Sequence, residues 1–128
     1  MATGQGTHFV KYPLQSAKII DFKLWQQCVQ LIGRKEHLTE SGFNQILSLK
    51  SALNLGLPEK IKAAFPKAVA LERPAYTGPV SPLNPHWVSG FTEGDGSFSV
   101  SIPSNGNEVK ASYTIRLNKR ETPLLHEI

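Results

Sequence analysis

Two carboxylates and a pair of glycines stand close together in residues 87–96, WVSGFTEGDG. Gly90 and Gly94 are four positions apart, so in a helix they share one face. Glycine in a helix costs about 0.5–1 kcal/mol relative to alanine, so two at this spacing require a reason. Small residues on one face allow a second backbone to approach closely. The pair therefore predicts a helix-packing face.

Glu93 and Asp95 fall at the C-terminal end of the same helix. The helix macrodipole is negative there, which disfavours anions unless a cation compensates. A hard divalent ion such as Mg²⁺ binds one or two carboxylates together with phosphate oxygens. A glycine-rich helix end with solvated acids is the alternative. A calcium loop is excluded, because Phe91 and Ile102 would occupy its first and last ligand positions.

The elements around these residues are readable from local patterns. Asn84 and Pro85 are a typical cap and first residue of a helix, which should run to about Gly94. Residues 97–102, SFSVSI, alternate strictly and predict a strand, and 103–107 predict a turn. A second alternating strand is expected over 109–118, and Thr122-Pro123 opens another helix.

The upstream part of the chain predicts helices and then a linker. Apolar spacing favours helices over 17–32, 39–54 and 59–65, with Thr39 as a cap. Five prolines within 66–85 exclude a helix interior or a central strand. This stretch is expected to cross a surface as an extended linker.

Composition excludes several classes of protein. Of the 128 residues, 40% are hydrophobic, which is enough for a packed core. A single cysteine, Cys28, excludes a disulfide scaffold and a cysteine-rich zinc site. No run of about 18 apolar residues is present, so no membrane span is expected. The net charge of +4 permits nucleic-acid binding without establishing it.

Residues 88–96, VSGFTEGDG, resemble the motif of the LAGLIDADG homing endonucleases, and SFSVSI continues as their first strand does. Residues 8–14, 34–57 and 63–69 resemble the closing helices and linker of the first repeat in single-chain fungal-organelle members. The resemblance implies an α+β fold of αββαββα repeats. It divides the chain into the C-terminal helices of repeat one (1–65), a linker (66–83) and the incomplete start of repeat two (84–128).

The same resemblance implies a site. Asp95 would be the catalytic, metal-binding acid, with Mg²⁺ as the divalent ion, and Glu93 a neighbour. Gly90 and Gly94 would pack against the motif helix of a second repeat. One face of the hairpin would contact double-stranded DNA, with Arg116 best suited to guanine. The residues expected on that face are Ser99, Ser101, Ser112, Thr114, Arg116 and Asn118.

With one acid of two, the chain is expected to need a second repeat, in cis or in trans, for metal-dependent DNA hydrolysis. Two alternatives stay open: an RNA maturase on the same fold, acting on its own intron, and a degenerate fragment without activity. Members of the family are usually encoded in organelle genomes, so a mitochondrial location is expected.

Overall fold

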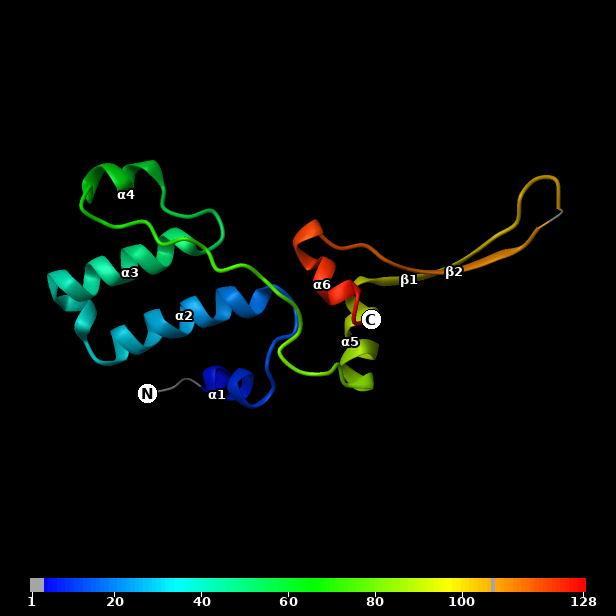
Figure 1. The fold of residues 1–128 in the computed structure, drawn as a ribbon, viewed down its shortest axis with the longest axis horizontal. Coiled ribbons are helices and arrows are strands. Elements are labelled where there is room, and N and C mark those ends of the chain that lie inside the picture. Colours follow the sequence, from blue (N-terminus) through cyan, green and yellow to red (C-terminus); the bar gives the residue numbers. More distant parts are fainter. Residues whose placement is uncertain (1–3, 107) are drawn as a thin grey trace.

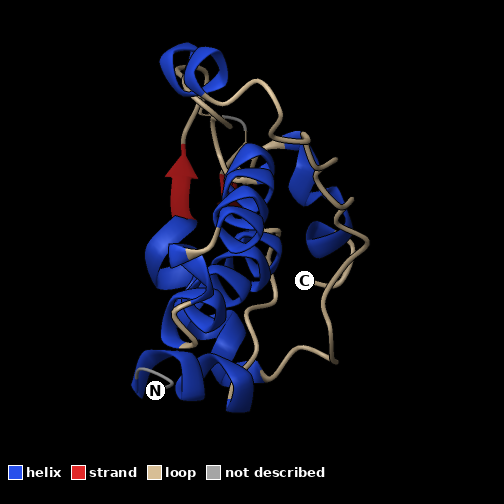
Figure 2. Cartoon of the chain, turned by 90° about the vertical axis from the view of Figure 1, so that its left-hand side faces the viewer, coloured by secondary structure: helices blue, strands red, loops and turns tan. Residues whose placement is uncertain are grey.

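A computed structural model describes residues 4–106 and 108–128 (Figure 1). Helices α1 to α4 form one end of the molecule, and a β-hairpin projects from the other (Figure 1). Viewed from the helical end, the helices lie in front of the strands (Figure 2). The elements are α1 Gly4–Lys11, α2 Lys18–Gly33, η1 Glu36–Leu38, α3 Glu40–Ala52, α4 Glu59–Ala64, α5 Pro85–Asp95, β1 Gly96–Ser101, β2 Lys110–Ile115, η2 Lys119–Glu121 and α6 Thr122–Leu125.

The core lies between α2 and α3, the two longest helices. Its buried residues recur along α2 near the helical period and meet the apolar face of α3. Cys28 packs at the edge of this cluster, and burial raises the pKa of its thiol, as expected for a small apolar residue. The buried cluster consists of Ile19, Ile20, Leu24, Leu31, Leu49 and Ala52. None of the helices in the described part of the chain has the length and apolarity of a membrane-spanning segment.

The predicted start of α3 is confirmed by its cap. The Thr39 hydroxyl accepts a hydrogen bond from Gly42 N at 3.0 Å and donates one to Glu36 O at 2.7 Å. This arrangement holds η1 tightly against the first turn of α3. A Cβ on Gly42 would lie 2.0 Å from Glu36 O, so only glycine fits at this position. The helix α1 was not predicted from the sequence.

The proline-rich stretch crosses the surface of the helices without forming a helix or strand, as predicted. Side chains fasten it along the way. Arg73 Nη1 donates to Asp21 Oδ1 at 2.6 Å and to Ala52 O at 3.0 Å. Leu71 N donates to Ser51 Oγ at 2.9 Å. The linker is therefore attached to both core helices.

The Arg73–Asp21 pair makes the stability of the chain depend on pH. The hydrogen bond from Arg73 holds the pKa of Asp21 below its ordinary value of 3.8, and the Asp21 side chain is only 12% exposed. A lowered folded-state pKa adds stability above the unfolded pKa, and this stability is lost as pH falls through the folded value. We expect Arg73→Gln to lower the free energy of unfolding by about 1.5–3 kcal/mol at pH 7. Urea titrations at several pH values should show that the difference in unfolding free energy between the parent chain and Arg73→Gln becomes smaller below pH 3.8.

A matched control is the exposed pair Lys62–Glu59, with a comparable N–O distance of 2.7 Å. Water screens this pair, so Lys62→Gln should change the free energy of unfolding by about 0.5 kcal/mol or less. Equal effects of the two substitutions would contradict a structural role for Arg73.

Candidate metal-binding carboxylate and nucleic-acid interface

The helix that bears the acidic motif begins as predicted. Asn84 caps α5 by accepting a hydrogen bond from His86 N at 2.8 Å, and Pro85 occupies the first turn. Trp87 and Phe91 stack along one side, with ring centroids 4.8 Å apart. These rings are half-buried, and no described residue of α5 is fully buried. Helix α5 is therefore only partly packed against the rest of the described chain.

The glycine face of α5 is open. Positions where Gly90 and Gly94 would bear a Cβ have no atom within 4 Å among the described residues. Both glycines are exposed, and none of the residues that the structure describes packs on the surface that they create. The face is thus free for a second helix to approach closely.

Asp95 ends α5 and is exposed, as is Glu93. The carboxylate lies at the negative end of the helix macrodipole, which favours a bound cation. The described residues contain no group of three or more histidine, cysteine, aspartate or glutamate side chains able to hold a metal ion. A single exposed carboxylate of this kind can supply one ligand to a hard divalent ion.

The hairpin starts directly from the acid. A Cβ on Gly96 would lie 2.7 Å from both Thr92 O and Thr92 Cγ2, so glycine permits the sharp exit of β1 from α5. The hydroxyls of Thr92 and Tyr113 are 2.8 Å apart and join the helix to β2. These contacts set the direction of the hairpin relative to Asp95.

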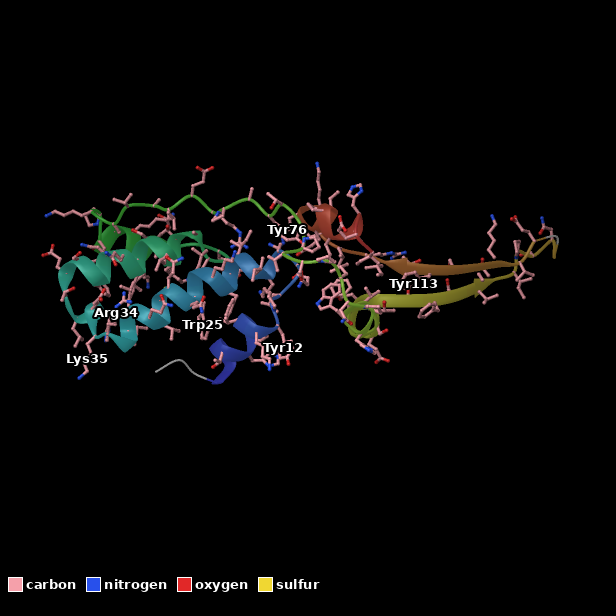
Figure 3. All side chains as sticks on the ribbon, turned by 60° about the horizontal axis from the view of Figure 1, so that its bottom comes forward. Tyr12, Trp25, Arg34, Lys35, Tyr76 and Tyr113 are labelled. Atoms are coloured by element: carbon pink, nitrogen blue, oxygen red, sulfur yellow. The ribbon has the colours of Figure 1, made fainter. Side chains whose placement is uncertain are left out.

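The strands alternate as predicted. Phe98 stacks on Tyr113 across the apolar face, with centroids 5.1 Å apart, and Figure 3 shows Tyr113 beside β1. On the other face Ser99 pairs with Ser112, and their hydroxyl oxygens are 2.7 Å apart. The polar face also contains the pairs Ser97–Thr114 and Ser101–Lys110.

The second strand is shorter than predicted. Strand β2 ends at Ile115, which pairs with Gly96, so Arg116 and Asn118 lie outside the paired strands. Asn118 caps η2 by accepting a hydrogen bond from Arg120 N at 3.1 Å. Its carboxamide oxygen thus turns the chain toward α6. Arg116 is exposed at the base of the hairpin, next to the end of α5.

Lys110 is a further candidate that the sequence analysis did not select. It lies on the polar face, opposite Ser101, and is ion-paired with Glu108 at 3.3 Å. Both side chains are exposed, so the pair contributes little and Lys110 can exchange it for a phosphate. Lys110, Ser112 and Thr114 occur at every second position, which places them on one face of a strand, and this spacing could have identified Lys110.

Comparison with known proteins relates these features to a family. Residues 88–128, which include most of α5 and the whole hairpin, match the model of the LAGLIDADG endonuclease family. A protein of Neurospora crassa described as probable intron-encoded endonuclease 3 is 38% identical over 121 residues, which are 94% of this chain and 22% of that protein. Probable intron-encoded endonuclease 2 of the same organism is 28% identical, over 94% of this chain and 28% of its own length.

Solved structures extend the likeness to most of the chain. The LAGLIDADG homing endonuclease I-SmaMI, bound to cleaved DNA, superposes with a TM-score of 0.80 at 36% identity, over 94% of this chain and 41% of its own. The meganuclease I-CpaMI, bound to uncleaved DNA, has the same TM-score of 0.80 and identity of 36%, and 43% of it is covered. This chain thus spans about a fifth to two-fifths of the relatives it matches. In sequence and in fold it therefore matches part of a LAGLIDADG homing endonuclease.

Proposed function

We propose that this chain is the part of a DNA endonuclease that joins the helices of one repeat (1–65), through a linker (66–83), to the motif helix and first hairpin of the next (84–128). The observation on which the proposal rests is the open Gly90–Gly94 face of α5, which ends on an exposed Asp95 and leads directly into a polar hairpin. A helix-packing face, a metal-binding acid and a candidate DNA surface therefore follow one another along the chain.

In the proposed enzyme the open face of α5 packs against the motif helix of a second repeat, supplied in cis or in trans. The second helix brings its own acid next to Asp95, at the bottom of the helix pair. Asp95 binds a divalent ion, for which we propose Mg²⁺, and such an ion activates water and stabilises the leaving oxygen in phosphodiester hydrolysis. The contribution of Asp95 is to hold that charge where the two helices meet.

The polar face of the hairpin is the proposed DNA contact. A two-stranded ribbon fits the major groove, and its rise of about 3.3–3.4 Å per residue is close to the rise of about 3.4 Å per base pair along the DNA helix axis. Side chains on one face are two residues apart, so each should meet about every second base pair. Ser99, Ser101, Ser112 and Thr114 supply hydroxyl groups for this surface, and Lys110 a positive charge. Arg116 would contact a phosphate or a guanine near Asp95.

Both curated relatives are described as endonucleases, which favours DNA cleavage over the maturase alternative. They are intron-encoded, which supports an organelle gene, and we include a mitochondrial location in the proposal.

The test is cleavage by the protein of the full reading frame. The substrate is a duplex that spans the insertion point of the coding intron, and we expect cuts in both strands with Mg²⁺ and none with excess EDTA. Gly94→Leu should lower the cleavage rate by about 100-fold or more, because a side chain on the open face moves the second acid by more than 1 Å. Ser89→Leu, an exposed change on the same helix, is the matched control. Cleavage that persists in EDTA, or that is equally fast in Gly94→Leu, would refute the proposal.

A further inference from the structure

The segment 13–17, between α1 and α2, contains a buried polar side chain that binds the linker. Gln15 is 8% exposed. Its Nε2 donates to Ser81 Oγ at 3.0 Å and to Pro13 O at 3.2 Å, and its Oε1 accepts from Val80 N at 3.0 Å. Both amide hydrogens and the amide oxygen are thus used, and two of the three bonds reach across more than 60 residues of sequence.

The same residue binds the linker a second time. The Tyr76 hydroxyl donates to Gln15 O at 2.5 Å, and the ring packs against the α2–α3 core. Figure 3 shows Tyr76 where the linker passes α6. Burial, with a smaller effect from the charge of Glu121, raises the pKa of Tyr76, so the hydroxyl keeps its proton and remains a donor.

The chain that leaves the hairpin returns to the same segment. Glu121, at the end of η2, accepts a hydrogen bond from Ala17 N at 2.9 Å through Oε2. Its carboxylate thereby lies at the positive end of the α2 macrodipole, which stabilises it there. Segment 13–17 therefore holds the chain just before α5 and again just after β2.

Helix packing by itself does not place α5 against the core. The main packing partners of α2 are α3 and η1, whereas α5 contacts β1. Among the described residues, the hydrogen bonds of Gln15 and Glu121 therefore link the helical end to the chain on either side of the α5–hairpin unit, and Tyr76 adds a bond from further up the linker. Gln15 is central among them because its side chain and its carbonyl both bind the linker.

We propose that Gln15 is a positioning residue, which sets α5, and with it Asp95, relative to the α2–α3 pair. An effect of Gln15 on the cleavage rate rests on the proposed function, since a displacement of about 1 Å in a reacting group can cost about 100-fold in rate. The position of α5 relative to α2 and α3 can be measured in this chain alone.

The test measures distances between spin labels in the 128-residue chain in a Cys28→Ala background. One pair of labels, at positions 23 and 93, spans the two units, and a second pair, at 23 and 45, lies within α2–α3. Gln15→Leu keeps the volume and removes all three side-chain hydrogen bonds. We expect it to shift or broaden the 23–93 distance by several ångströms while the 23–45 distance stays unchanged. Tyr76→Phe should give a smaller shift in the same pair.

The control is Gln27→Leu, the same substitution at an exposed position of α2, which should alter neither distance. An unchanged 23–93 distance in Gln15→Leu, or equal broadening of both pairs, would overturn the inference. If Gln15→Leu does not fold, Tyr76→Phe decides on the same criterion. The distances are measured without DNA, so they test the role of Gln15 even if the proposed endonuclease function is wrong. In the full enzyme Gln15→Leu should lower kcat with little change in KM.

Discussion

Replacing Asp95 by asparagine is expected to abolish metal-dependent DNA cleavage while leaving the fold and DNA binding intact. The carboxamide has the same shape but no charge, and it is a weak ligand for a hard divalent ion. Loss of several kcal/mol of transition-state stabilisation corresponds to about 1,000-fold or more in rate. The side chain is exposed and lies at the negative end of α5, so removing its charge should leave α5 as stable or slightly more so. The cleavage rate of the full enzyme and the circular dichroism of the variant are the two measurements.

Glu93→Gln is the matched control for Asp95→Asn. It makes the same chemical change two residues earlier, on an acid that is also exposed. We expect its cleavage rate to remain within about threefold of the parent, because Asp95 alone is the proposed ligand; threefold corresponds to about 0.7 kcal/mol. Undiminished cutting by Asp95→Asn, or equal losses in both variants, would show that the last acid of the motif has no special role.

Gly42→Ala is expected to destabilise the helical end more than any other single methyl addition considered. The new Cβ would lie 2.0 Å from Glu36 O, and that oxygen is backbone, which cannot rotate away as a side chain would. Either η1 moves off α3 or the Thr39 cap is lost. Overpacking of this kind costs about 3 kcal/mol or more. Urea unfolding of the chain, followed by circular dichroism, measures the loss.

Gly90→Ala tests the same substitution where space is open. No atom lies within 4 Å of its Cβ position among the described residues, so the change should stabilise α5 in this chain by about 0.5–1 kcal/mol. Amide hydrogen exchange in α5 resolves this local gain. The same variant should impair cleavage by the full enzyme if the face packs against a second helix. A destabilised α5 in the isolated chain would contradict the open face.

Local rules explain why the motif region was predictable. The Asn84 cap, the proline after it and the strict alternation of Phe98 and Val100 with serines act within a few residues, so the start of α5 and the register of β1 follow from the sequence. The Thr39 cap was predictable for the same reason. Local patterns mispredict the end of β2, because the alternation of polar and apolar residues continues to Arg116 and Asn118 although the paired strand stops at Ile115.

Tertiary structure decided the features that depend on distant partners. Strand β2 stops at Ile115 because β1 begins at Gly96 and offers no further partner, and Asn118 then serves as a cap. The tight contact at Gly42 depends on the position of Glu36 O, and the side-chain bonds of Gln15 depend on the linker passing beside it. The sequence by itself determined the helix that bears Asp95, its glycine face and the alternating hairpin. The structure determined how that unit is held against the helices, because hydrogen bonds between residues more than 60 positions apart leave no periodic trace in the sequence.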